Sequence, residues 1–268
     1  MRNNLTLVIT GAAAVLLTLS SCSISLFCIR GEGSAETFPV SASGFTAIAA
    51  ANHADVVLAQ GSAYKVEVRA QQNVYDNMDV YVRDEVLHIE NDRCVVQGPA
   101  TVYVTMPSLE TATTSGTGDI QIEGFSDVGD LELKVTGTGD IDLAGTAITA
   151  KGSAALAGDR FTFLISGTGD IVAEFDATEV DATLSGTGSM ALSGSADSQD
   201  VILSGTGSYR AFELETTTAK VTLSGTGSAD VNVTDALSGT LSGTGDITYR
   251  GNPAVDVTDS GTGDVQPE

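Results

Sequence analysis

Residues 201–211 read VILSGTGSYRA, and the pentapeptide at 204–208 within them decides the fold. The same pattern, Ser/Thr-Gly-Thr-Gly-Asp/Ser, recurs through the second half of the chain at intervals of 18 to 21 residues, apart from one interval of 30. Its copies start at Ser115, Thr136, Ser166, Ser185, Ser204, Ser224, Ser242 and Ser260. Such regular spacing is typical of proteins in which neighbouring repeats stack. The longer interval marks an insertion or a degenerate copy at 147–159.

Apolar residues hold fixed places around each copy. In the copy quoted above, Leu203 lies two residues before the first glycine, and Tyr209 and Ala211 follow the motif. The place between the last two is polar in most copies, as at Arg210, and this alternation predicts strands with one buried face. A single copy cannot bury that face alone, whereas stacked copies align it in ladders at the ~4.8 Å strand spacing. We therefore expect an all-β fold, a β-solenoid with strand, corner and strand in each copy.

The two glycines of each copy are expected to form the corner. A sharp corner needs either a positive φ or a close approach of two backbones, and glycine tolerates both without a steric penalty. These structural glycines are Gly116, Gly118, Gly137, Gly139, Gly167, Gly169, Gly186, Gly188, Gly205, Gly207, Gly225, Gly227, Gly243, Gly245, Gly261 and Gly263.

The composition excludes several classes of partner. The 268 residues include 12 Lys and Arg against 35 Asp and Glu, a formal net charge of −23. Nucleic acid is excluded because phosphate binding requires basic side chains that displace counterions. Docking on anionic lipid through a basic face is excluded for the same reason. The hydrophobic fraction of 42% supports a folded core.

The N-terminus carries the features of an export signal. A positively charged start is followed by an apolar run from Leu5 to Leu19, which is too short to span a ~30 Å hydrocarbon core as a helix. The run ends in Leu19-Ser20-Ser21-Cys22, which resembles the bacterial lipobox. We expect a lipoprotein signal peptide at 1–21, a lipidated Cys22 and a tether at 22–36, with an ordinary secretory peptide as the alternative. Ser23 stands where lipoprotein sorting would need Asp for retention in an inner membrane, which favours the outer membrane.

Two cysteines remain, Cys28 and Cys94. Outside the cytoplasm such a pair often forms a disulfide, and two unpaired thiols are the alternative. No Cys-x-x-Cys occurs, and His53 and His88 stand apart, so we expect no metal site.

An ordered set of motifs precedes and enters the first repeat. Its members are Gly44-Phe45-Thr46, Asp55–Gly61, Tyr64–Val68, Leu87-His88-Ile89, Val104–Glu110 and Ser115–Ile120. In this set the chain resembles the head GIN domain family, also described as auto-transporter adhesins, from about Phe38 to the C-terminus. The resemblance implies a right-handed β-helix on bacterial lipoproteins, an adhesive role and no catalytic residues. We expect a strand-rich part at 37–112 and solenoid repeats at 113–268, within one domain.

The last position of the motif is the best candidate for chemistry. It is occupied by Asp119, Asp140, Asp170, Asp246 and Asp264, and by Ser189, Ser208 and Ser228. Stacked carboxylates could bridge through Ca²⁺, which prefers oxygen ligands. Alternatively, each side chain accepts hydrogen bonds from its own turn, as in Asx-turns. Serine in three consecutive copies favours the second interpretation, and we expect neither a metal nor a cofactor.

Catalysis is the second class of function to weigh. Paired carboxylates cleave glycosidic bonds, and Asp140/Asp142 and Asp256/Asp259 are such pairs. The repeats have few basic residues for an anionic polymer, the chain has no Trp, and no His lies near the repeat serines. We predict a non-catalytic protein, held at the membrane by its N-terminal lipid, that interacts with a surface protein or glycan. The alternatives are an envelope-maintenance lipoprotein in the periplasm and, more weakly, a polysaccharide-active enzyme.

Overall fold

The computed structural model describes residues 28–143 and 156–268. The expected signal peptide at 1–21, the lipidation site Cys22 and most of the irregular segment at 147–159 lie outside the described residues. The last four residues of that segment belong to strand β14. Within the described part no helix is long and apolar enough to cross a membrane.

Over residues 28–143 and 156–268 the fold is all-β, apart from one short helix, α1 (Gln72–Tyr75), that no sequence pattern predicted. The strands are Ile29–Arg30 (β1), Glu36–Val40 (β2), Ala47–Ala50 (β3), Asp55–Gln60 (β4), Lys65–Ala70 (β5), Met78–Arg83 (β6), Val86–Asn91 (β7), Val95–Gln97 (β8), Thr101–Met106 (β9), Thr111–Thr114 (β10), Ile120–Glu123 (β11), Asp130–Val135 (β12), Ile141–Leu143 (β13), Leu156–Ile165 (β14), Ile171–Leu184 (β15), Met190–Leu203 (β16), Tyr209–Leu223 (β17), Ala229–Leu241 (β18), Ile247–Arg250 (β19), Ala254–Asp259 (β20) and Val265–Pro267 (β21).

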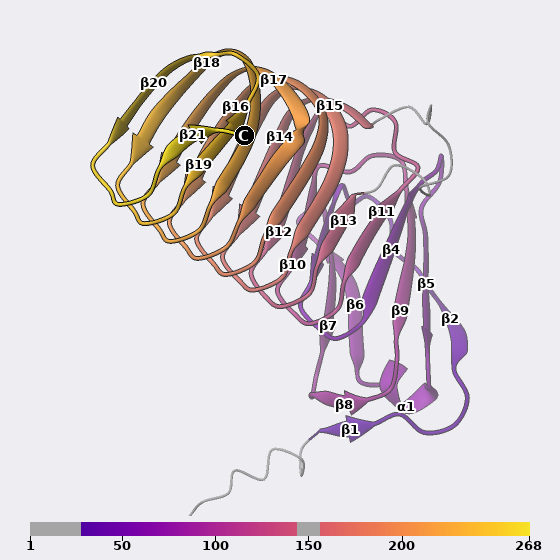
Figure 1. Cartoon of the computed structure of the whole chain (residues 1–268). Coiled ribbons are helices and arrows are strands. Elements are labelled where there is room, and N and C mark those ends of the chain that lie inside the picture. The colour runs from indigo at the N-terminus through magenta and orange to yellow at the C-terminus, as the bar shows by residue number, and fades with distance from the viewer. Residues whose placement is uncertain (1–27, 144–155) are drawn as a thin grey trace, which may run out of the picture.

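The repeats wind as coils, where one coil is the chain between two successive motifs (Figure 1). Strand β15 pairs with β16 in parallel, from Ile171 opposite Met190 to Leu184 opposite Leu203, so residues one repeat apart lie side by side. The same parallel pairing links β14 to β15, β16 to β17 and β17 to β18. Each coil therefore contacts mainly the coil before it and the coil after it.

The stack begins before the first motif. Strands β3 and β4 pair in parallel with β10 and β11, which places Ala47 beside Thr111 and Val56 beside Ile120. The corner between β3 and β4 contains Asn52 and no glycine. On the other side of this coil, β7 and β9 also run parallel to β3 and β4. Antiparallel pairs of β2 with β5, β5 with β9 and β6 with β7 complete this end.

The apolar columns face inward as the alternation predicted. Leu203 is 1% exposed, and Tyr209 and Ala211 are fully buried, whereas Arg210 between them is exposed. A buried polar chain crosses this core: the Tyr209 hydroxyl donates to Gln199 Oε1 at 2.8 Å, and Gln199 Nε2 donates to Thr216 Oγ1 at 2.8 Å. Burial raises the pKa of the Tyr209 phenol, which keeps it neutral as a donor.

The motif glycines owe their place to close packing of coils, and none of them has a positive φ. A Cβ added at Gly205 would lie 2.0 Å from the carbonyl oxygen of Gly186, one coil earlier. That carbonyl accepts a hydrogen bond of 3.1 Å from the Thr206 amide. Of the two reasons weighed for glycine at the corner, backbone approach is therefore the one that applies.

Cys28 and Cys94 form a disulfide, with their Cα atoms 4.6 Å apart. Strand β1 pairs in parallel with β8, outside the main sheet, and both strands adjoin the bonded cysteines. The bond and this short pair fix the start of the described chain to the loop after β7 (Figure 1).

Candidate functional site: the aspartate ladder

The aspartates that end the motif form a ladder of hydrogen bonds between coils. The Asp140 amide donates to Asp119 Oδ1 at 2.9 Å, and the Asp170 amide donates to Asp140 Oδ1 at 2.7 Å. Ser189 continues the series with an amide bond of 2.6 Å to Asp170 Oδ1. Each carboxylate therefore satisfies a backbone N–H of the next coil, which would otherwise need another acceptor at the bend.

This geometry corrects the expected hydrogen-bond partner. The sequence interpretation assigned each motif aspartate to the backbone of its own turn, but the acceptors serve the following coil. The reason is the parallel stack, which places the side chain of one copy beside the amide of the next. An Asx-type bond within one turn does occur at Asp259, whose Oδ1 accepts from the Gly261 amide at 2.9 Å, just before the last motif.

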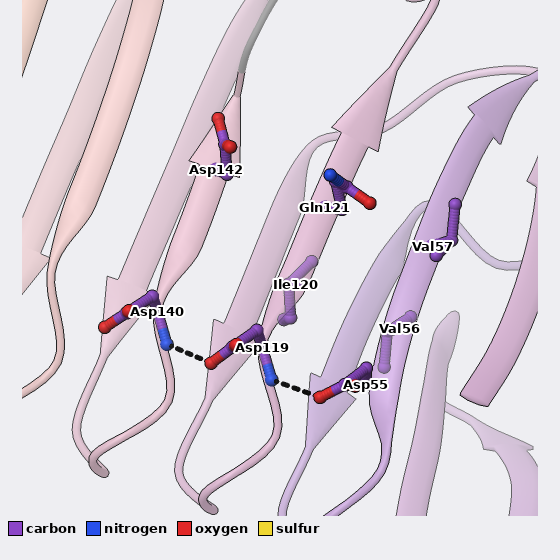
Figure 2. Close-up of a pocket in the computed structure, with 8 residues that line it drawn as sticks. All are labelled: Asp55, Val56, Val57, Asp119, Ile120, Gln121, Asp140 and Asp142. Atoms are coloured by element: carbon purple, nitrogen blue, oxygen red, sulfur yellow. Dashed lines mark hydrogen bonds between the residues drawn. The ribbon is translucent and has the colours of Figure 1, made fainter. Parts of the chain in front are cut away.

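The ladder includes one member that sequence reasoning missed. The Asp119 amide donates to Asp55 Oδ1 at 3.2 Å, so Asp55 holds the motif position in the coil that lacks the motif (Figure 2). The signal was present in the sequence: Asp55 precedes Val56 and Leu58 as Asp119 precedes Ile120 and Ile122. Without the glycines to mark the corner, this register was not recognised.

A shallow cavity of about 270 Å³ lies beside the first three members of the ladder. Asp55, Asp119 and Asp140 line one side of it, and Gln121 and Asp142 stand further along the strands (Figure 2). Asp142 Oδ1 is buried and has no hydrogen-bond partner among the described residues. The cavity is acidic, and its motif carboxylates already accept backbone hydrogen bonds.

The two carboxylate pairs weighed for catalysis are not arranged as acid and base. Asp140 accepts the amide of the next coil, while Asp142 lies on the outward face of β13 with its carboxylate turned away from Asp140 (Figure 2). Asp259 accepts from its own turn, and Asp256 is an exposed residue of the same strand, β20.

No three His, Cys, Asp or Glu side chains within 28–143 and 156–268 gather in a way that could hold a metal ion. Both ring nitrogens of His53 are engaged, Nε2 with the Gly98 carbonyl at 3.0 Å and Nδ1 with Asn91 Nδ2 at 2.9 Å. His88 stacks on Tyr81, with ring centroids 5.0 Å apart. His53 lies two residues before Asp55 in the chain, but both of its ring nitrogens are used elsewhere.

Outside the ladder, neighbouring carboxylates disfavour the charged form of Asp79. The charge of Asp92 and a hydrogen bond to it raise the pKa of Asp79, and the charge of Glu90 adds to this. Asp79 and Glu90 are directly opposite each other on the antiparallel strands β6 and β7, an arrangement that is unfavourable for like charges.

These features define an all-β protein of stacked coils with a ladder of side-chain acceptors along one corner. The chain belongs to the family described as "Putative auto-transporter adhesin, head GIN domain", which matches residues 44–160 and 144–253. The resemblance drawn from the motifs is therefore confirmed.

Solved structures share this fold. A putative adhesin from Parabacteroides distasonis is 23% identical with a TM-score of 0.81, and one from Parabacteroides merdae is 21% identical with a TM-score of 0.82. A putative lipid binding protein from Parabacteroides distasonis is 21% identical, also with a TM-score of 0.81. Each comparison covers 90% of this chain and 99% of the other. At these identities the likeness establishes the fold alone. A search of curated proteins gave no match.

Proposed function

We propose that this protein is an exported, lipid-anchored β-solenoid, right-handed as in the resemblance, that acts in adhesion at the cell surface without catalysis. Membership of the adhesin-like family is the observation that carries the proposal. The parallel register between successive repeats supports the solenoid architecture. In this proposal the coils form a stiff acidic rod whose outer face is available to a partner.

The lipid anchor is proposed to sit on Cys22 in the outer membrane. The lipobox sequence supports this site, and Cys22 lies six residues before the disulfide-bonded Cys28. Several acyl chains hold a protein firmly, whereas one chain binds marginally. Fatty-acid labelling of cells is expected to mark the parent chain and not Cys22→Ala, and a labelled variant would exclude this anchor.

The absence of catalysis is part of the same proposal. The engagement of the motif carboxylates in backbone hydrogen bonds supports it, because a general acid or base must be able to reach a substrate proton. Turnover of neutral or acidic polysaccharides by the purified protein would overturn this point.

Protease treatment of intact cells tests the location. A C-terminal tag should be lost from intact cells if the coils lie outside, and the tag should survive until the outer membrane is breached if they face the periplasm. Loss supports the adhesin, and protection replaces it with the envelope-maintenance role.

A further inference from the structure

Strand β17 pairs irregularly with both of its neighbours at Phe212. In the pairing of β16 with β17, Ala191 lies opposite Arg210 and Ser193 lies opposite Glu213. Strand β17 therefore has one more residue than β16 over this interval. On the other side, Ala211 pairs with Val231 and the next pair joins Glu215 to Asn232. Residues 212–214 therefore bulge from the ladder, and the pairing of β17 with β18 shifts again between Thr216 and Thr218. Bulges of this kind redirect side chains and are common beside functional sites.

An aromatic ring lies on the outside of the stack at this bulge. The outward row that contains Phe212 otherwise holds polar side chains, including Ser193, Asn232 and Arg250. The phenylalanines of β14 and β15, by contrast, are fully buried and pack against one another: Phe161, Phe163 and Phe175. Asn232 Nδ2 donates to the Phe212 carbonyl at 3.2 Å and so holds the bulged backbone.

A cavity of about 370 Å³ lies beside this ring. Its walls are mainly apolar, formed by Val172, Ala191, Leu192 and Phe212, and polar groups enter from Arg210 and Asp230. Val172 is 48% exposed, which is unusual for a large aliphatic side chain in this protein. An apolar hollow with a few convergent polar groups is the usual form of a small-ligand site.

The charges around the cavity restrict the ligand. Arg250 covers one face of Phe212, with its guanidinium carbon 4.3 Å from the ring centroid, and is held by Glu213 and by Glu268. A cationic ligand would thus have to displace the Arg250 guanidinium from this face of the ring. An anionic ligand would approach a protein of formal charge −23 whose local guanidinium groups are largely balanced by carboxylates.

Two polar groups remain for a ligand. Arg210 and Asp230 line the cavity and lie directly opposite each other on β17 and β18, where their charges attract. Burial raises the pKa of Asp230, and the charge of Arg210 opposes this effect. Arg210 offers donors and Asp230 offers acceptors. An uncharged sugar ring has hydroxyls for both groups and an apolar C–H face for the wall formed by Val172 and Phe212.

We propose that the cavity beside Phe212 binds an uncharged sugar unit of a surface glycan. The inference rests on the proposed adhesive function and assigns a ligand class to it. The site discriminates against sugars that carry a carboxylate, because the protein has a formal charge of −23 and the guanidinium of Arg250 is already paired with Glu213 and Glu268.

Binding of the full-length protein to immobilised oligosaccharides tests the site. The probes are oligosaccharides ending in galactose, glucose, mannose or fucose, each with a sialylated counterpart. We expect at least one neutral probe to bind, its sialylated form to bind more weakly, and Phe212→Ala or Arg210→Gln to reduce binding about tenfold or more. Because Arg210 is exposed, Arg210→Gln should fold normally and can still test the site if Phe212→Ala fails to fold. Val172→Ser should weaken binding, whereas Ile202→Ser, at a residue 44% exposed on another outward row, should not.

Three outcomes would overturn the proposed ligand. The protein binds no neutral probe, it prefers the sialylated forms, or its binding is unchanged in both Phe212→Ala and Arg210→Gln. The adherence of intact cells distinguishes failure of the proposed sugar site from failure of the proposed adhesive function. Cells that lose adherence when the chain is deleted but keep it with the Arg210 variant contradict the sugar site alone. Cells that adhere equally well without the chain contradict the adhesive function itself.

Discussion

The Asp140 amide donates a 2.9 Å hydrogen bond to the carboxylate of Asp119, the residue at the same position one coil earlier. The two aspartates carry like charges and lie on adjacent coils, yet the amide of one offsets the charge of the other. A side chain thus connects neighbouring coils at the bend, where the regular strand ladder is interrupted. This explains why the motif accepts Asp readily, and it gives the Asp119 carboxylate a structural role.

Removing one carboxylate from the ladder should destabilise the stack. Asp140→Ala leaves the Asp170 amide without its acceptor and should lower the free energy of unfolding by about 1 kcal/mol. Asp142→Ala is the matched control, because Asp142 has no hydrogen-bond partner among the described residues and should leave stability unchanged or slightly raised. Chemical denaturation compares the two, and equal losses would argue against the ladder.

A methyl group at the corner should be far more damaging. Gly205→Ala would place its Cβ 2.0 Å from the Gly186 carbonyl oxygen, so the backbones of two coils must separate, at a cost of about 2 kcal/mol or more. In Gly61→Ala the new Cβ approaches only the Thr105 methyl, which is the end of a side chain and can rotate away. Thermal melting should therefore distinguish the two variants clearly. A Gly205→Ala protein as stable as Gly61→Ala would contradict the close approach of coils.

The buried polar chain through the core can be tested at Tyr209. Tyr209→Phe removes the hydroxyl that donates to Gln199 Oε1 and leaves this buried oxygen without a donor. The expected loss is about 1–3 kcal/mol of unfolding free energy. Tyr103→Phe, at a residue 40% exposed, should change stability little when measured by the same denaturant titration.

The stability contributed by Asp79 should depend on pH in a defined direction. Its pKa is raised in the folded protein, mainly by Asp92, so the folded state binds the proton more tightly than the unfolded state. The contribution is favourable below the ordinary value of 3.8 and is lost as the pH rises through the folded pKa. Asp79→Asn should therefore melt higher than the parent at neutral pH, with the difference vanishing near pH 3. Asp197→Asn, at an exposed carboxylate of β16, should show no such trend. A constant difference across the pH range would exclude this charge effect.

The inward columns and the strand–corner–strand order were predictable because they depend on local alternation repeated many times. Leu203 and Tyr209 are buried as that alternation required. The coil containing Asp55 was not recognised, because its corner lacks the glycines that mark the others. The partner of Asp140 depends on the stacking of two coils, which a pattern within one copy does not specify. The bulge at Phe212 was missed for a related reason: it appears only when β17 is aligned with both neighbours.

The disulfide between Cys28 and Cys94 has a mechanical consequence. Tension that reaches the chain ahead of Cys28 passes through the covalent bond to Cys94, which lies 66 positions further along the sequence. Strands β2 to β7 lie within that loop and are shielded from the load, while β9 is the first strand of the main sheet to receive it. Strand β9 is paired with both β4 and β5. A pull from this side therefore shears a doubly paired strand and does not peel the sheet open from β2.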